Sequence, residues 1–300
     1  MHPRLTPTTA LLLTIPPLMW AGNAVVGRMV NELVPPMMLN LLRWALAFVL
    51  LLPLAAPVLR WNSELWAYWR RFSVLGLLSV GAYNALQYLA LHTSTPINVT
   101  LVAASTPVWM LLIGHLFFGA TTTPRQLLGA ALSVTGVLLV LSRGQLEFLL
   151  GLRLVPGDVY VLLASVAWAF YSWMLTQPGK EPASIRGDWA AFLMAQIVFG
   201  LGWAGLFAAG EWALTDAHIH WGWPLLGALL FVALGPALLA YRCWAAGVRR
   251  AGPTVSSFFA NLTPLFAALL SSALLGDLPH GYHVGAFALI VGGIVISARR

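Results

Sequence analysis

Residues 96–119 read PINVTLVAASTPVWMLLIGHLFFG, and residues 253–276 read PTVSSFFANLTPLFAALLSSALLG. The two segments share an initial proline, a central Thr-Pro pair and a final glycine, each separated by 157 residues. Beyond the glycines the match continues after a one-residue deletion, with Gly129 matching Gly285 and Gly136 matching Gly292. An internal repeat in an apolar chain is typical of membrane architectures in which a solute path lies between the two halves.

The composition predicts an integral membrane protein. The chain is 60% hydrophobic and 8% charged, with a mean hydropathy of +0.83, whereas a soluble domain carries about 25% charged residues. The net charge of +7 would suit nucleic acid, but the arginines gather at the ends of the apolar segments, where membrane orientation explains them better. The single cysteine, Cys243, excludes an internal disulfide framework and a cysteine-based zinc cluster.

Ten apolar segments are long enough to cross a bilayer, which takes about 20 residues. They cover residues 9–29, 36–57, 72–93, 97–118, 125–142, 157–176, 189–210, 224–246, 253–276 and 281–298. No small-residue cleavage site follows the first segment, so no removable signal peptide is expected. The predicted fold is an all-α integral membrane protein, with one five-helix repeat in residues 1–150 and another in residues 151–300. Because five is odd, the second repeat enters the membrane in the opposite direction, which makes the two repeats inverted.

The positions of lysine and arginine predict the orientation, since loops rich in these residues stay in the cytoplasm. With the N-terminus inside, the cytoplasmic side holds eleven of them: Arg4, Arg60, Arg70, Arg71, Arg125, Lys180, Arg186, Arg249, Arg250, Arg299 and Arg300. The other side holds only Arg28, Arg143 and Arg153. Both termini are therefore predicted to lie in the cytoplasm.

The WAGN segment at residues 20–23, Arg43 in the second span and the repeated proline- and glycine-marked hairpins resemble the EamA-type drug/metabolite transporters. The resemblance covers nearly the whole chain, and the aromatic richness is most similar to the aromatic amino-acid exporters of the YddG type. It implies a secondary transporter of a bacterial inner membrane that exports aromatic and other neutral amino acids, or similar small metabolites, by alternating access. The family often has Glu after the loop glycine, where this chain has Ala120 in the first half and Asp277 in the second.

Polar and aromatic side chains at helical spacing mark a candidate substrate cavity. In the third span, spacings of three and four place four of them on one side: Tyr83, Asn84, Gln87 and Tyr88. Amides facing lipid would be costly if unpaired, so they should face either a cavity or, as the alternative, partners on other helices.

The other candidate substrate-binding residues come from both halves, in which Trp20 aligns with Trp168. They are Trp20, Asn23, Ser105, Trp109, Trp168, Tyr171, Tyr241, Trp244, Phe258 and Asn261. A cavity with this lining suits a planar amphipathic solute, because rings stack on rings and an ammonium group can lie over a ring face.

The placement of charged residues narrows the mechanism. All nine acids lie in loops or at span ends, which disfavours a carboxylate proton relay, and no P-loop Lys-Ser/Thr pair is present. Arg43 either holds a substrate carboxylate or pairs with carbonyls at a helix junction, and we favour the structural role.

Two other functions stay open at this point. The first is efflux of planar organic cations. The second is an intramembrane enzyme, which would need a nucleophile–base pair or a metal cluster, and the sequence brings no His, Cys and acid together. We expect no catalytic residues, no metal and no cofactor, with amino acids and the lipid bilayer as the partners.

Prolines and glycines inside the spans mark candidate hinges at Pro107, Pro264, Gly235 and Pro236. A proline removes a backbone hydrogen bond and kinks a helix, which either lets one half rock or only shapes the cavity.

Glycines also recur every seven residues in the fifth and tenth spans, as Gly129 with Gly136 and Gly285 with Gly292. Small residues permit close helix packing. The two spans would use these glycines to pack either on each other or on a second copy. We favour the internal contact and therefore expect a monomer.

Overall fold

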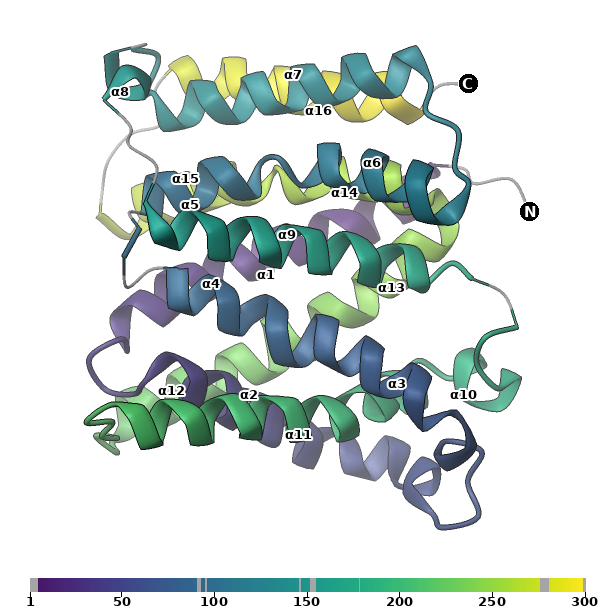
Figure 1. Ribbon diagram of the computed structural model, residues 1–300. Coiled ribbons are helices and arrows are strands. Elements are labelled where there is room, and N and C mark those ends of the chain that lie inside the picture. The colour runs from purple at the N-terminus through teal and green to yellow at the C-terminus, as the bar shows by residue number, and fades with distance from the viewer. Residues whose placement is uncertain are drawn as a thin grey trace.

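The computed structural model describes residues 5–90, 93–94, 96–145, 147–151, 155–177, 179–275 and 281–298. Within these ranges every regular element is a helix (Figure 1), which confirms the predicted all-α class for the described residues. The long uninterrupted helices are α1 (Pro7–Met29), α2 (Pro36–Ala55), α7 (Pro124–Leu141), α9 (Pro156–Met174), α11 (Trp189–Leu214) and α16 (Gly281–Ala298). Several residues used above lie outside the described ranges: Arg4, Arg153, Gly276, Asp277, Arg299 and Arg300.

Four further segments consist of consecutive shorter helices. They are α3 (Trp69–Gly76) with η3 (Leu77–Tyr83) and α4 (Asn84–Ala90); α5 (Pro96–Ala103) with α6 (Thr106–Phe118); α12 (Trp223–Val232) with η4 (Ala233–Leu239) and α13 (Ala240–Ala251); and α14 (Pro253–Ala260) with α15 (Thr263–Leu275). The connections carry the short helices η1 (Ala56–Leu59), η2 (Trp66–Tyr68), α8 (Glu147–Leu150) and α10 (Ala183–Gly187).

Eight segments of the described chain are long and apolar enough to cross a membrane. They are Pro7–Gly27, Pro36–Leu59, Trp66–Ala90, Pro124–Leu141, Trp189–Leu214, Trp223–Ala251, Pro253–Leu270 and Gly281–Ala298. The predicted span 97–118 is interrupted, and its apolar helix Thr106–Phe118 is shorter. The predicted span 157–176 coincides with α9, whose 19 residues include Asp158, two tyrosines and two serines. The molecule is thus a multi-pass membrane protein, although the predicted number of ten spans exceeds the eight that meet these criteria.

Both halves of the chain run through one bundle (Figure 1). α1 begins and α16 ends at the same end of this bundle, which is also where α2 and α9 end, α3 begins and α10 lies. We call it the α10 end. α1 runs away from the α10 end, whereas α9, which opens the second matched half, runs toward it.

The third helical segment of each half contains a π-helical stretch at a matching place. η3 spans Leu77–Tyr83 and η4 spans Ala233–Leu239, both seven residues long. The predicted kink at Gly235 and Pro236 falls inside η4. Because proline cannot donate the usual backbone hydrogen bond, the wider π turn accommodates it. π turns are frequent at functional sites, and both of these lie beside the polar side chains described below.

At each of the two matched Thr-Pro pairs the chain forms two separate helices and not one bent helix. α5 ends at Ala103 before α6 begins at Thr106, and α14 ends at Ala260 before α15 begins at Thr263. Pro107 and Pro264 therefore each occupy the second position of a new helix, where a missing N–H costs nothing. The predicted spans 97–118 and 253–276 are therefore each made of two consecutive helices, and each interruption lies at the Thr-Pro pair where the sequence analysis marked Pro107 and Pro264.

Side chains satisfy the carbonyl groups that the first break leaves free. The Thr106 hydroxyl donates to the carbonyl oxygen of Ala103 at 2.6 Å. The amide of Asn261, at the other break, donates to the carbonyl oxygen of Ala104 at 3.3 Å and to Ser133 Oγ on α7 at 2.9 Å. Ala104 and Asn261 are separated by 157 residues, so equivalent positions of the repeat contact each other.

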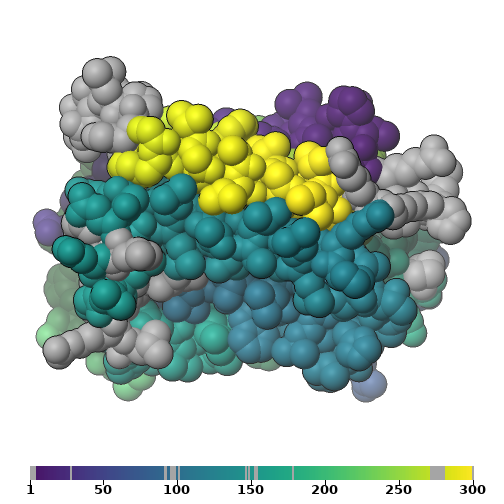
Figure 2. Space-filling view, turned by 90° about the horizontal axis from the view of Figure 1, so that it is seen from above, coloured from purple at the N-terminus to yellow at the C-terminus, as the bar shows by residue number. Residues whose placement is uncertain are grey.

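α7 and α16 lie side by side on one face of the bundle (Figures 1 and 2). A methyl group added at Gly129 would lie 2.7 Å from the carbonyl oxygen of Gly293, and one added at Gly136 would lie 2.9 Å from that of Ala286. Glycine is therefore required for this close approach, and the internal contact favoured above is present. The prediction for Gly292 was wrong, because no atom of another helix lies within 4 Å of a methyl group placed there.

Large apolar side chains are exposed along the outside of the bundle. Examples are Leu11, Val49, Leu116, Leu206 and Val284. Soluble monomers rarely expose extended apolar surfaces, whereas lipid-facing helices require them. Polar side chains are instead found in the interior, where α1, α2, α4, α9 and α13 meet.

Candidate functional site

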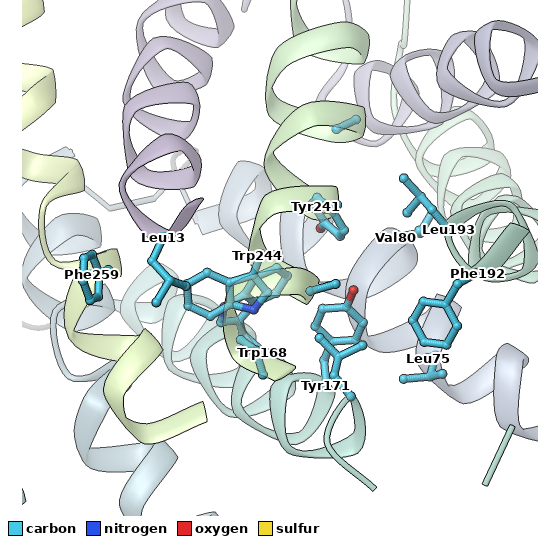
Figure 3. Close-up of a cluster of buried hydrophobic side chains, with 14 of the residues drawn as sticks. Leu13, Leu75, Val80, Trp168, Tyr171, Phe192, Leu193, Tyr241, Trp244 and Phe259 are labelled. Atoms are coloured by element: carbon cyan, nitrogen blue, oxygen red, sulfur yellow. The ribbon is translucent and has the colours of Figure 1, made fainter. Parts of the chain in front are cut away.

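Six aromatic rings cluster in the centre of the bundle. Trp168 on α9, 1% exposed, contacts the other five at centroid distances of 5.3 Å to Trp20, 4.5 Å to Tyr83, 5.0 Å to Tyr171, 5.5 Å to Tyr241 and 5.4 Å to Trp244. All six were predicted from the sequence as lining residues. Figure 3 shows four of them, with Trp168 and Trp244 on one side and Tyr171 and Tyr241 on the other.

Both halves of the chain build this aromatic cluster. Trp20 on α1 and Trp168 on α9 are the aligned tryptophans of the two repeats, and their rings meet edge to face. Trp244 from α13 closes the group, and its indole N–H donates to the hydroxyl of Ser172 at 3.1 Å. Edge-to-face and tilted ring pairs stabilise such a cluster beyond their area burial.

A polar cluster centred on Arg43 lies beside the rings. Arg43 is 0% exposed, and its Nη1 donates to Asn84 Oδ1 at 3.1 Å, to the Tyr88 hydroxyl at 3.2 Å and to Asn23 Oδ1 at 3.5 Å. The Tyr88 hydroxyl also donates to Asn23 Oδ1, at 3.3 Å. The Arg43 guanidinium lies 5.2 Å from the ring centroid of Trp44. A structural role would pair Arg43 with backbone carbonyls, whereas its hydrogen-bond acceptors here are side-chain oxygens.

The polar cluster is joined to η3 and to the rings. Asn84 Nδ2 donates to the Tyr241 hydroxyl at 3.4 Å, and this hydroxyl donates to the carbonyl oxygen of Ser79 in η3 at 2.8 Å. Asn40 Nδ2 donates to the next carbonyl, that of Val80, at 3.0 Å. Asn84 and Tyr241 are also 157 residues apart. Residues of the two halves therefore form one connected network.

Several polar atoms of this region have no hydrogen-bond partner although they are fully buried. Four are donors: Nε and Nη2 of Arg43, and the indole nitrogens of Trp44 and Trp168. Two are amide oxygens, on Asn40 and Gln196. Buried polar groups are nearly always hydrogen-bonded, so this concentration of free donors marks the centre of the bundle as a candidate binding site. The sequence analysis gave Arg43 two possible roles, but no pattern in the sequence indicated Trp44.

Of the remaining predicted residues, Gln87 lies beside the aromatic cluster, where its side chain hydrogen-bonds Tyr83, and the others lie elsewhere. Ser105 accepts a hydrogen bond from the indole N–H of Trp109 at 3.1 Å, and Trp109 packs in a separate apolar cluster with Met110 and Ile113. Asn261 braces the helix break described above. Phe258 is fully buried in the main core, and the half-buried Gln87 lies one turn beyond Tyr83 on α4.

The rings leave little space beside them. A cavity of about 10 Å³ is lined by residues that include Tyr171, Gln196 and Tyr241, which is roughly the size needed for one water molecule. In this conformation that cavity is too small for an amino acid. No group of three or more His, Cys, Asp or Glu side chains among the described residues could hold a metal ion.

A second arginine cluster lies at the α10 end. Arg71 donates from Nε to Glu181 at 2.8 Å, from Nη1 to Gln177 Oε1 at 3.1 Å and from Nη2 to the Met174 carbonyl at 2.6 Å. Arg186 bonds the other oxygen of Glu181 at 2.5 Å and donates to two carbonyls at the end of α9. The Glu181 side chain is 0% exposed. These contacts tie α3, α9 and α10 together.

A bundle of apolar spans with a buried polar and aromatic centre defines a multi-pass membrane protein. The chain belongs to the EamA-like transporter family, whose model matches residues 7–142 and 155–299. This match confirms the family that the sequence motifs resembled.

Known relatives match over most of the chain. An uncharacterised transporter of Archaeoglobus fulgidus is 27% identical, covering 97% of this chain and 98% of the relative. The uncharacterised inner membrane transporter YedA of Escherichia coli K12 is 26% identical over 93% and 87% of the two chains, and the aromatic amino acid exporter YddG of Ancylobacter novellus is 24% identical over 78% and 78%. A crystal structure of a protein 22% identical to this chain matches its fold with a TM-score of 0.74, over 97% of this chain and 96% of that chain.

Proposed function

We propose that this transporter exports aromatic and other neutral amino acids across a bacterial inner membrane by alternating access. The observation that carries the proposal is the aromatic cluster around Trp168, because planar amphipathic solutes bind where rings can stack. The relative from Ancylobacter novellus, which is named an aromatic amino acid exporter, favours the same substrate class.

The alternating-access mechanism rests on a proposed architecture of ten spans in two inverted repeats, residues 1–150 and 151–300. Opposite directions of α1 and α9 support it. Contacts between equivalent residues support it as well: Trp20 meets Trp168, and Asn84 and Ala104 each bond a residue 157 positions later. Such contacts are expected where a pseudo-twofold axis passes through the molecule, and in inverted-repeat transporters the solute binds near that axis.

The proposed orientation places both termini in the cytoplasm. The α10 end contains the start of α1, the end of α16 and the arginines of the second cluster, which fits the preference of basic residues for the cytoplasmic side. We also propose a monomer, because α7 and α16 use their glycines within the chain.

The test is exchange of labelled tryptophan by purified protein in liposomes preloaded with unlabelled amino acids. We expect rapid exchange that phenylalanine inhibits and a planar organic dication does not. Trp168→Ala should abolish most of the exchange, and Trp168→Phe should retain part of it. As a matched control, Trp61→Ala removes an indole that is 96% exposed and should exchange like the wild type. Flux of organic cations without amino-acid exchange would contradict the proposal and favour cation efflux.

A further inference from the structure

We propose that Arg43 binds the carboxylate group of the transported solute, so that the protein selects planar aromatic carboxylates, aromatic amino acids among them. The inference rests on the proposed function and names the chemical group that the site recognises.

Arg43 is a buried charge for which the described residues supply no ion-pair partner. Arg43 is 0% exposed in the middle of the bundle, and the ion pairs found among the described residues both belong to Glu181 and not to Arg43. A buried charge without a counter-charge is strongly unfavourable. The neutral oxygens of Asn23, Asn84 and Tyr88 reduce this cost but do not neutralise the guanidinium. An anionic ligand would neutralise it.

The centre of the bundle also has unused hydrogen-bond donors. Nε and Nη2 of Arg43 and the indole nitrogens of Trp44 and Trp168 lack acceptors. The rings of Trp44 and Trp168 both contact Tyr241, at 4.9 Å and 5.5 Å, so the free donors belong to one neighbourhood. A carboxylate offers two oxygens with about four acceptor positions and accepts paired hydrogen bonds from arginine. The excess of donors therefore matches a carboxylate and not an ammonium group.

Arg43 contrasts with a structural arginine in the same protein. Arg71 uses all three of its guanidinium nitrogens, on Glu181, Gln177 and the Met174 carbonyl. Arg43 uses Nη1 alone, for three acceptors at once. An arginine that only joins helices would be bonded as Arg71 is. The free side of Arg43 is therefore assigned to a ligand.

The chain offers the substrate ammonium a weaker partner. The eight acids among the described residues lie in loops, in the short helix α8 or near the ends of long helices. An ammonium can therefore approach only neutral partners, namely the ring faces of the aromatic cluster and the free amide oxygens of Asn40 and Gln196. A charge-assisted pair between arginine and carboxylate is stronger than a cation–ring contact. Removing the carboxylate from a substrate should therefore weaken binding more than removing its amino group.

The test compares two indole compounds as inhibitors of tryptophan exchange in liposomes. Indole-3-propionate keeps the carboxylate and lacks the amine, whereas tryptamine keeps the amine and lacks the carboxylate. We expect indole-3-propionate to inhibit nearly as well as unlabelled tryptophan and tryptamine to inhibit at least about tenfold more weakly. Equal inhibition by the two compounds would overturn the proposal.

Substitution of the arginine gives a second readout. In Arg43→Gln the half-saturating tryptophan concentration should rise by about tenfold or more, and the preference for indole-3-propionate over tryptamine should disappear. Arg43→Lys keeps the charge without the planar fork and should retain part of the preference. Arg125→Gln makes the same change at an exposed position at the start of α7 and should match the wild type. A preference that survives in Arg43→Gln would contradict the assignment.

The outcomes separate this inference from the proposed function. Exchange of tryptophan with no preference for the carboxylate compound would leave the function standing and reject the Arg43 site. Exchange of indole-3-propionate without exchange of any amino acid would reject the proposed function and leave the Arg43 site standing. Should Arg43→Gln fail to fold, the inhibitor comparison on the wild type still decides the question.

Discussion

The two arginine clusters differ in how completely their charges are paired. At the α10 end, Glu181 lies between Arg71 and Arg186 at 2.8 Å and 2.5 Å, and Gln177 and backbone carbonyls accept further hydrogen bonds from the two arginines. In the centre, no acid among the described residues forms an ion pair with Arg43, and two of its nitrogens have no acceptor. A fully paired cluster fixes the relative positions of helices, whereas an unpaired buried charge is suited to binding an anion. We therefore expect substitutions in the first cluster to affect stability and those in the second to affect substrate binding.

The largest loss of stability is expected for Glu181→Ala. This change leaves Arg71 and Arg186 without their shared counter-charge, and breaking a buried pair costs about 3 kcal/mol or more. Because the two arginine side chains are 16% and 23% exposed, hydration recovers part of that cost, and about 2 kcal/mol is expected. Thermal unfolding of the purified protein measures the change. An unaltered unfolding midpoint would contradict the stabilising role assigned to the cluster around Glu181.

A packing change without any charge provides a scale for the same measurement. In Gly293→Ala the new methyl group would lie 2.6 Å from the Gly129 carbonyl oxygen, so α16 must move away from α7, and overpacking of this kind costs about 1–3 kcal/mol. The adjacent Gly292→Ala is the control, because no atom lies within 4 Å of its added methyl group. If both variants unfold alike, the contact of α7 with α16 differs from the one described.

Arg43→Gln should change the unfolding midpoint little, in contrast to Glu181→Ala. The substitution removes an uncompensated buried charge, and its amide can still donate to Asn23 or Asn84. Replacing buried charges by neutral groups is often neutral or stabilising. A midpoint lowered as far as in Glu181→Ala would indicate that Arg43 also serves mainly to hold helices together.

The smallest effect is expected at a polar contact on the surface of the α10 end. Glu64 accepts a hydrogen bond from the Ser184 hydroxyl at 2.5 Å, and both residues are exposed. Exposed pairs contribute little to stability, so Glu64→Gln should unfold like the wild type. A clear loss there would show that the whole α10 end, and not Glu181 in particular, determines stability.

Local patterns in the sequence predicted much of the fold. Hydropathy located the long helices, and the repeat placed Trp20 and Trp168 at equivalent positions that prove to be in contact. The spacing of Asn84 and Tyr88 predicted a shared face, and both side chains bond Arg43.

The sequence did not predict features that depend on contacts between residues far apart in the chain. Ser105 and Trp109 have the spacing of a cavity face, but the same spacing lets them hydrogen-bond to each other. The helix break before Thr106 depends in part on Asn261, which supplies a donor from the other half of the chain. Arg43 had two possible roles because only coordinates reveal which of its nitrogens lack acceptors.

The most direct test of the central claim is the shift of the unfolding midpoint on adding saturating tryptophan. A ligand that binds only the folded state stabilises it by about 2.7 kcal/mol at 100 times its Kd. We predict a clear upward shift in the wild type, the same shift from a lower starting midpoint in Glu181→Ala, and a shift about half as large or smaller in Arg43→Gln, because its Kd for tryptophan should be about tenfold higher or more. An equal shift in Arg43→Gln would contradict the account, because tryptophan would then bind without the unpaired arginine.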